Sequence, residues 1–167
     1  MCKTSMIAPT RSRPLGFALP VKGAEVPTSE AWFHEVKYDG YRMMMIREDE
    51  RMRLISQGGV DYAKRYPWIV EAALQNRHKH FVIDGEVVLL GVDGISDFDG
   101  PHSGKHNNEV RLYTFDILAL DGEDLRALPL SLSGRPILRS CWHGGRTASS
   151  SNPFKRVAGR NIGRGRR

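Results

Sequence analysis

The stretch Glu35–Arg42, EVKYDGYR, decides the fold, because it ends one predicted strand, turns and begins the next. Asp39-Gly40 is typical of a type I′ hairpin turn, in which both central residues have positive φ. We therefore predict a strand over 32–37 and its hairpin partner over 41–47. Lys37 lies just before this turn and Arg42 just after it, and a lysine so placed is a candidate nucleophile. An exposed lysine at a strand end is the plain structural alternative.

The rest of the central region is read as strands and turns with one helix. Strands are predicted over 52–56, 81–83, 86–92 and 110–120, where apolar and β-branched residues gather between Gly- and Asp-rich turns. Pro67 favours the first turn of a helix, and the residues after it predict that this helix runs to Asn76. Antiparallel strands with one or two helices indicate an α+β domain, built on a sheet that is covered on one side.

Length and composition limit the class of protein. A chain of 167 residues with 40% hydrophobic residues suits one globular domain or part of a larger protein. Its apolar runs, such as 87–90, are far too short to span a bilayer, so we expect a cytoplasmic protein with no membrane partner. Cys2 and Cys141 lie far apart, in a pattern that indicates neither a disulfide framework nor a zinc site.

Composition and charge together divide the chain into three segments. We predict an extended lead-in over 1–30, a folded domain over 31–130 and a basic tail rich in Gly, Ser and Arg over 131–167. From Leu125 onward there are ten Lys and Arg residues and no Asp or Glu, so this part contributes a charge of +10. The whole chain has a net charge of +6, and 6 − 10 leaves −4 for residues 1–124. Such a tail has little to bury, which predicts disorder. It is either a nonspecific nucleic-acid arm or an end without a role.

Three runs point to nucleotide chemistry. They are Lys37 with Asp39, Gly40 and Arg42, then Asp84-Gly85-Glu86, then Tyr113-Thr114-Phe115-Asp116. A lysine amine that attacks the α-phosphate of a nucleoside triphosphate must first lose its proton, which a field of positive charge favours. Arg42 and Mg²⁺ are the predicted sources of that field. Glu86 is a candidate for binding the ribose or the metal, and Phe115 offers a face for the base.

These runs resemble the adenylation domain of ATP-dependent DNA ligases, most closely the bacterial end-joining (ligase D) type. The matching stretches are 32–42 (WFHEVKYDGYR), 83–88 (IDGEVV) and 113–126 (YTFDILALDGEDLR). The resemblance implies a nucleotidyltransferase fold with antiparallel sheets and helices, incomplete at its C-terminal end. It also implies ATP and Mg²⁺ as cofactors, nicked double-stranded DNA as substrate, and a place in DNA repair and recombination.

The resemblance also assigns roles to single residues. Lys37 would be the lysine that becomes linked to AMP, and Glu35 would lie beside the adenine. Arg42 and Glu86 would hold the ribose, with Glu86 the candidate metal ligand as well, and Phe115 would stack on the base. Asp39 and Gly40 would form the turn of the motif.

The chain also departs from the family's pattern. The stretch 56–59, SQGG, has glutamine where the family has an arginine near the phosphates. The family's E-G-x-V-x-K and K-x-K runs are absent from the sequence. We therefore predict a truncated, inactive ligase remnant, a pseudoenzyme. The alternatives are a non-catalytic fragment that binds nucleotide or nucleic acid, and a guanylyltransferase of the RNA-capping type.

Overall fold

The computed structural model describes residues 16–17, 22–23, 38–91, 96–97, 106–129 and 154–156, and for 96–97 and 154–156 it describes the backbone. The predicted strand 32–37 lies outside these residues, as do Glu35 and Lys37. Among the described helices, none is long and apolar enough to cross a membrane. The cytoplasmic location stays a prediction.

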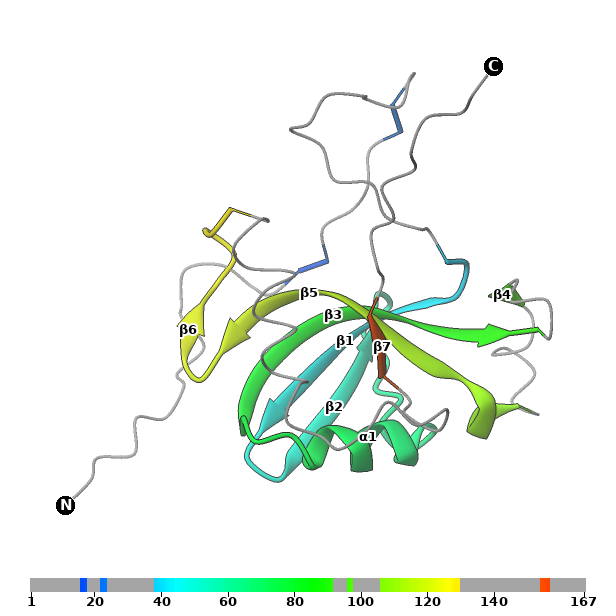
Figure 1. The fold of residues 1–167 in the computed structure, drawn as a ribbon, viewed down its shortest axis with the longest axis horizontal. Helices are drawn as coiled ribbons and strands as arrows, with labels where there is room; N and C mark the ends of the chain where they lie inside the picture. The colour runs from blue at the N-terminus through cyan, green and yellow to red at the C-terminus, as the bar shows by residue number, and fades with distance from the viewer. Residues whose placement is uncertain are drawn as a thin grey trace.

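A twisted sheet forms the body of the protein (Figure 1). Its main path runs β2-β1-β3-β5-β6, and every neighbouring pair on this path is antiparallel. These strands are β1 (Tyr41–Glu48), β2 (Arg51–Ser56), β3 (His80–Leu90), β5 (Arg111–Leu120) and β6 (Glu123–Asp124). The short β4 (Ser96–Asp97) pairs with the end of β3, and β7 (Phe154–Arg156) pairs in parallel with β5. A single 3₁₀ turn, η1 (Asn107–Glu109), precedes β5.

The helix α1 (Pro67–Leu74) lies across one face of the sheet, which we call the helix face (Figure 1). Pro67 stands at its start, as predicted, where the missing N–H costs no hydrogen bond. Ile69 and Ala73 of α1 are buried against alternate residues of the strands, and this forms the main core. Its buried members are Met43, Met45, Met52, Leu54, Tyr66, Ile69, Ala73, Phe81, Ile83, Val87, Leu89, Val110, Leu112, Ile117 and Leu125. The predicted α+β class is confirmed.

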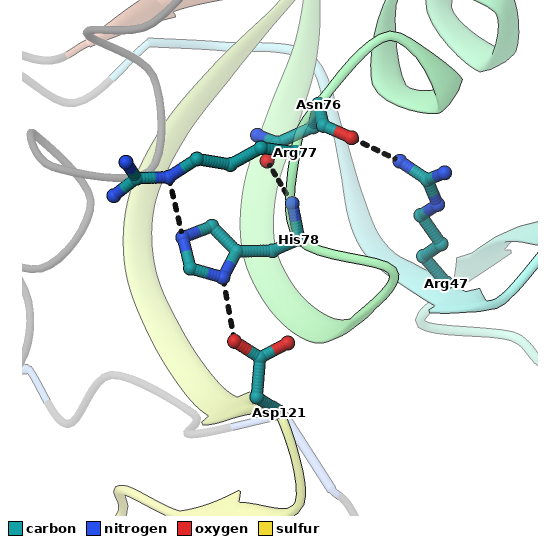
Figure 2. Close-up of polar contacts among 5 residues, drawn as sticks. All are labelled: Arg47, Asn76, Arg77, His78 and Asp121. Carbon is teal, nitrogen blue, oxygen red and sulfur yellow. Dashed lines mark hydrogen bonds and ion pairs between the residues drawn. The ribbon is translucent and has the colours of Figure 1, made fainter.

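Arg47 caps the C-terminal end of α1 (Figure 2). Its guanidinium, on a residue that is only 3% exposed, donates to the carbonyl oxygens of Ala73 at 2.8 Å and Asn76 at 2.9 Å. A third bond, from Nε to the carbonyl of Asp49, is 2.9 Å long. A cation at the C-terminus of a helix satisfies carbonyls that have no partner within the helix, and it opposes the negative end of the helix dipole. Arg47 therefore ties β1 to α1.

Next to this cap, a polar cluster joins the start of β3 to the end of β5 (Figure 2). His78 Nδ1 lies 2.6 Å from a carboxylate oxygen of Asp121, and Asn76 accepts the backbone N–H of His78. Asp121 and Gly122 both have positive φ, 45° and 97°, and form the two-residue link between β5 and β6. This is the geometry that an Asp-Gly pair favours in a hairpin.

Two sequence predictions are wrong in an informative way. Asp39-Gly40 is not a type I′ turn, because neither residue has positive φ. The strands predicted on either side of Asp84-Gly85 are one continuous strand, β3, whose pairing with β5 shifts register between these two residues. Asp-Gly pairs suit turns in general, but here neighbouring strands hold both pairs in other conformations.

Candidate functional site

The face of the sheet opposite α1 carries the candidate site, and we call it the site face. Side chains alternate along a strand, so Arg42 shares this face with Met44 of β1, and Asp84 and Glu86 share it with Val82 and Val88 of β3. Two small apolar clusters flank the polar residues. The buried residues Met44, Val82 and Leu118 form the Met44 cluster, against which Phe17, Ile46 and Ala119 pack. The buried residues Val88 and Tyr113 form the Val88 cluster, against which Tyr38, Leu90 and Phe115 pack.

Strand register brings distant runs of the sequence together. Arg42 of β1 lies opposite Glu86 of β3, and Glu86 lies opposite Tyr113 of β5. In the next row of β3, Asp84 lies opposite Asp116. Of the site residues that the sequence predicted, Arg42, Glu86 and Phe115 therefore come from three adjacent strands and share one face. The roles predicted for them, and for Lys37 and Glu35 outside the described residues, stay predictions.

Gly40 is tied to this face by Glu86. The backbone N–H of Gly40 donates to Glu86 Oε1 at 2.9 Å. A Cβ at Gly40 would lie 2.3 Å from the carbonyl oxygen of Val87. Because that oxygen belongs to the backbone, a side-chain movement could not relieve the clash. Glycine is therefore required here by close packing against β3. Because Gly40 comes three residues after Lys37, Glu86 fixes the backbone just downstream of the predicted nucleophile.

Gly85 serves a similar purpose on β3. A Cβ there would lie 2.7 Å from the carbonyl oxygen of Tyr113, and the register shift falls immediately before it. A bulge of this kind re-aims the residues on either side of it. In the run Asp84-Gly85-Glu86, the glycine thus lets β3 and β5 approach while both acidic residues stay on the site face.

Arg42 and Asp84 form a two-pronged ion pair. Nε and Nη2 of Arg42 donate to the two carboxylate oxygens of Asp84 at 3.1 and 2.7 Å. The side chain of Asp84 is 3% exposed and that of Arg42 is 20% exposed. The hydrogen bonds from Arg42 to Asp84 raise the pKa of the guanidinium above its ordinary value, and the charges of Asp84, Glu86 and Asp116 act in the same direction.

Arg42 was predicted to supply a positive field, and its pairing with Asp84 leaves that role a prediction. The carboxylates of Asp84, Glu86 and Asp116 all act on the Arg42 guanidinium, and Asp84 is its ion-pair partner. The described residues contain no group of three or more His, Cys, Asp or Glu side chains able to hold a metal. The role of Glu86 as a Mg²⁺ ligand stays a prediction.

Aromatic rings border the polar pair. The Arg42 guanidinium carbon lies 5.2 Å from the centroid of the Phe115 ring, within cation–π range. Tyr38 and Tyr113 pack ring to ring at 4.4 Å, and burial raises the pKa of Tyr113, with Tyr38 acting in the same direction. The site face therefore combines a fixed cation, carboxylates and ring faces, which is the kind of surface that binds a ribose and a base.

Comparison with known proteins shows the family of this chain. A family model described as "ATP dependent DNA ligase domain" matches residues 21–151, which is more than half of the chain. The chain belongs to this family.

Its relatives narrow the type. The multifunctional non-homologous end joining protein LigD of Pseudomonas aeruginosa is 35% identical over 109 residues, or 64% of this chain and 13% of that protein. The crystal structure of the ligase domain from Mycobacterium tuberculosis LigD matches with a TM-score of 0.55 and 29% identity, over 65% of this chain and 36% of that one. A mycobacterial DNA ligase D complexed with ATP and MES shares the fold, with a TM-score of 0.57 and 23% identity over 75% and 39% of the two chains.

These matches confirm the predicted resemblance to an adenylation domain of the LigD type. The chain spans about an eighth of the length of the LigD relative from Pseudomonas aeruginosa.

Sequence reasoning missed three contributors to the site. Asp84 lies inside a run that was singled out, yet its partner Arg42 is 42 residues away and no local pattern pairs them. Asp116 likewise acts on Arg42 from β5. Phe17 lies in the predicted lead-in, where no periodicity marked it, and it packs against the Met44 cluster.

Proposed function

We propose that this chain binds ATP on the site face and accepts AMP on Lys37, as the nucleotide-binding part of a ligase adenylation domain in end-joining DNA repair. The observation that carries the proposal is the hydrogen bond between Glu86 and the Gly40 N–H. It joins the segment after Lys37 to the Asp84-Gly85-Glu86 run, next to Phe115 and Arg42.

The reaction follows from the groups involved. The Lys37 amine, once deprotonated, would attack the α-phosphorus, forming a P–N bond as the bond to the bridging oxygen breaks and pyrophosphate leaves. Glu86 would hold the ribose, and its carboxylate would hold Mg²⁺ together with the phosphates. Mg²⁺, when bound, would supply the counter-charge for the phosphates. Nicked double-stranded DNA is the proposed acceptor in the later steps.

A second candidate is nucleotide binding without transfer. It is favoured by the tight pairing of Arg42 with Asp84, which already occupies two donors of this guanidinium. An inactive remnant of a ligase would behave in this way.

One experiment separates the two candidates. The protein is incubated with ATP labelled on the α-phosphate, with and without Mg²⁺, and covalent label is measured after denaturation beside ATP binding at equilibrium. Lys37→Ala is compared with Lys64→Ala, which removes an exposed lysine elsewhere on the chain. Label on the wild type and on Lys64→Ala, but not on Lys37→Ala, supports transfer. ATP binding without label supports the second candidate, and the absence of both refutes nucleotide binding.

A further inference from the structure

Phe17 contacts the site face from outside the sheet. It packs against the Met44 cluster, and its ring centroid lies 5.6 Å from the guanidinium carbon of Arg42. It also lies before residue 21, where the match to the ligase domain family begins. The contact therefore comes from a part of the chain that the family match leaves out.

The guanidinium of Arg42 is held from several directions. Two of its nitrogens donate to the carboxylate of Asp84, which fixes the plane of the group. The rings of Phe17 and Phe115 lie over its carbon at 5.6 and 5.2 Å. Four segments of the chain thus meet at one cation: the lead-in, β1, β3 and β5.

The rings of Phe17 and Phe115 can have different roles in the site. Phe115 is the ring predicted to stack on the base, and a base that takes the face now used by Arg42 would end that cation–π contact. Phe17 would still cover the guanidinium in that case. With Phe17 in place, Phe115 could stack on the base while the Arg42 guanidinium stays beside Asp84.

We infer that Phe17 is a positioning residue of the nucleotide site, which holds the Arg42 guanidinium in place and makes the lead-in part of that site. The inference rests on the proposed function for its nucleotide readout. It goes beyond that function because it assigns a role to a residue outside the ligase runs.

Phe17→Leu is the decisive variant. Leucine keeps an apolar contact with the Met44 cluster but has no ring to place over Arg42, whereas Phe17→Tyr keeps the ring and is the matched control. A partly exposed cation–π contact predicts that Phe17→Leu weakens ATP binding by about two- to fivefold, and that Phe17→Tyr binds like the wild type. Thermal melting of each variant checks that the fold is kept, and Phe17→Met replaces Phe17→Leu if the latter does not melt cooperatively.

A second readout needs no nucleotide. A guanidine-selective dicarbonyl reagent is applied to the nucleotide-free protein, and the modification of Arg42 is followed by peptide mass spectrometry with the exposed Arg51 as internal reference. We expect Arg42 to react several times faster in Phe17→Leu than in the wild type or in Phe17→Tyr, while Arg51 is unchanged. Unaltered Arg42 reactivity in Phe17→Leu overturns the inference. If the wild type binds ATP, an ATP affinity of Phe17→Leu equal to that of the wild type overturns it as well. A wild type that binds no ATP refutes the proposed function instead, and the reactivity of Arg42 then decides separately whether Phe17 holds it.

Discussion

Removing either partner of the Arg42–Asp84 pair should destabilise the protein, and by unequal amounts. Asp84 is almost fully buried, with 3% of its side chain exposed, whereas 20% of the Arg42 side chain is exposed. Arg42→Met leaves a buried carboxylate without its two donors, a change that costs about 3–5 kcal/mol of unfolding free energy. Asp84→Asn leaves a cation that water can reach and keeps one acceptor for it, so we expect a loss of about 1–3 kcal/mol.

The assay is urea unfolding followed by tryptophan fluorescence and circular dichroism. Arg51→Met, on the exposed start of β2, is the control and should change the unfolding free energy by less than about 0.5 kcal/mol. The double variant of Arg42→Met and Asp84→Asn should lose less than the sum of the two single variants, because each removes the same pair of hydrogen bonds. Strict additivity, or a larger loss from Asp84→Asn than from Arg42→Met, would refute the reasoning.

Three further changes test other parts of the fold. Arg47→Met keeps an apolar stem but removes three bonds to backbone carbonyls, so the urea midpoint should fall by the equivalent of about 2–4 kcal/mol; an unchanged midpoint would mean that the cap does not hold α1. Tyr66→Phe removes a buried hydroxyl that has no hydrogen-bond partner among the described residues, so the melting temperature should stay the same or rise, and a clear fall would contradict this. Hydrogen bonds from Arg126 lower the pKa of Asp124 to about 2, so the carboxylate stabilises the fold above its unfolded pKa near 4, and this contribution is lost as the pH falls toward 2. Because the pair is exposed, Asp124→Asn should cost no more than about 0.5 kcal/mol near neutral pH and nothing near pH 2, in melts compared at the two pH values; an equal cost at both would contradict the assignment.

The local elements of the fold could largely be predicted from the sequence. Pro67 begins α1 as expected, and the helix ends at Leu74, two residues before the predicted end. The strand predicted over 110–120 is β5, which begins at Arg111. These elements follow from proline geometry and from apolar patterning, which depend on neighbours within a few residues.

Two Asp-Gly pairs mark where local reasoning stops. Asp121-Gly122 adopts the positive φ values of a type I′ turn, but Asp39-Gly40 does not, although both pairs carry the same local signal. At Gly40, the carbonyl of Val87 lies where a Cβ would be, and Glu86 binds the N–H. A hydrogen bond between residues 46 positions apart therefore helps to set the backbone conformation at Gly40.

The sequence by itself determined the family, because the runs around Lys37, Asp84-Gly85-Glu86 and Phe115 together match the pattern of ATP-dependent DNA ligases. It also determined the start of α1 and most strand positions, because these follow from local geometry. Only the tertiary structure decided that Arg42 is paired with Asp84 and covered by Phe17. That arrangement depends on strand register and on the docking of a distant segment, which set the charge and the exposure of the site and leave no signal in the local sequence.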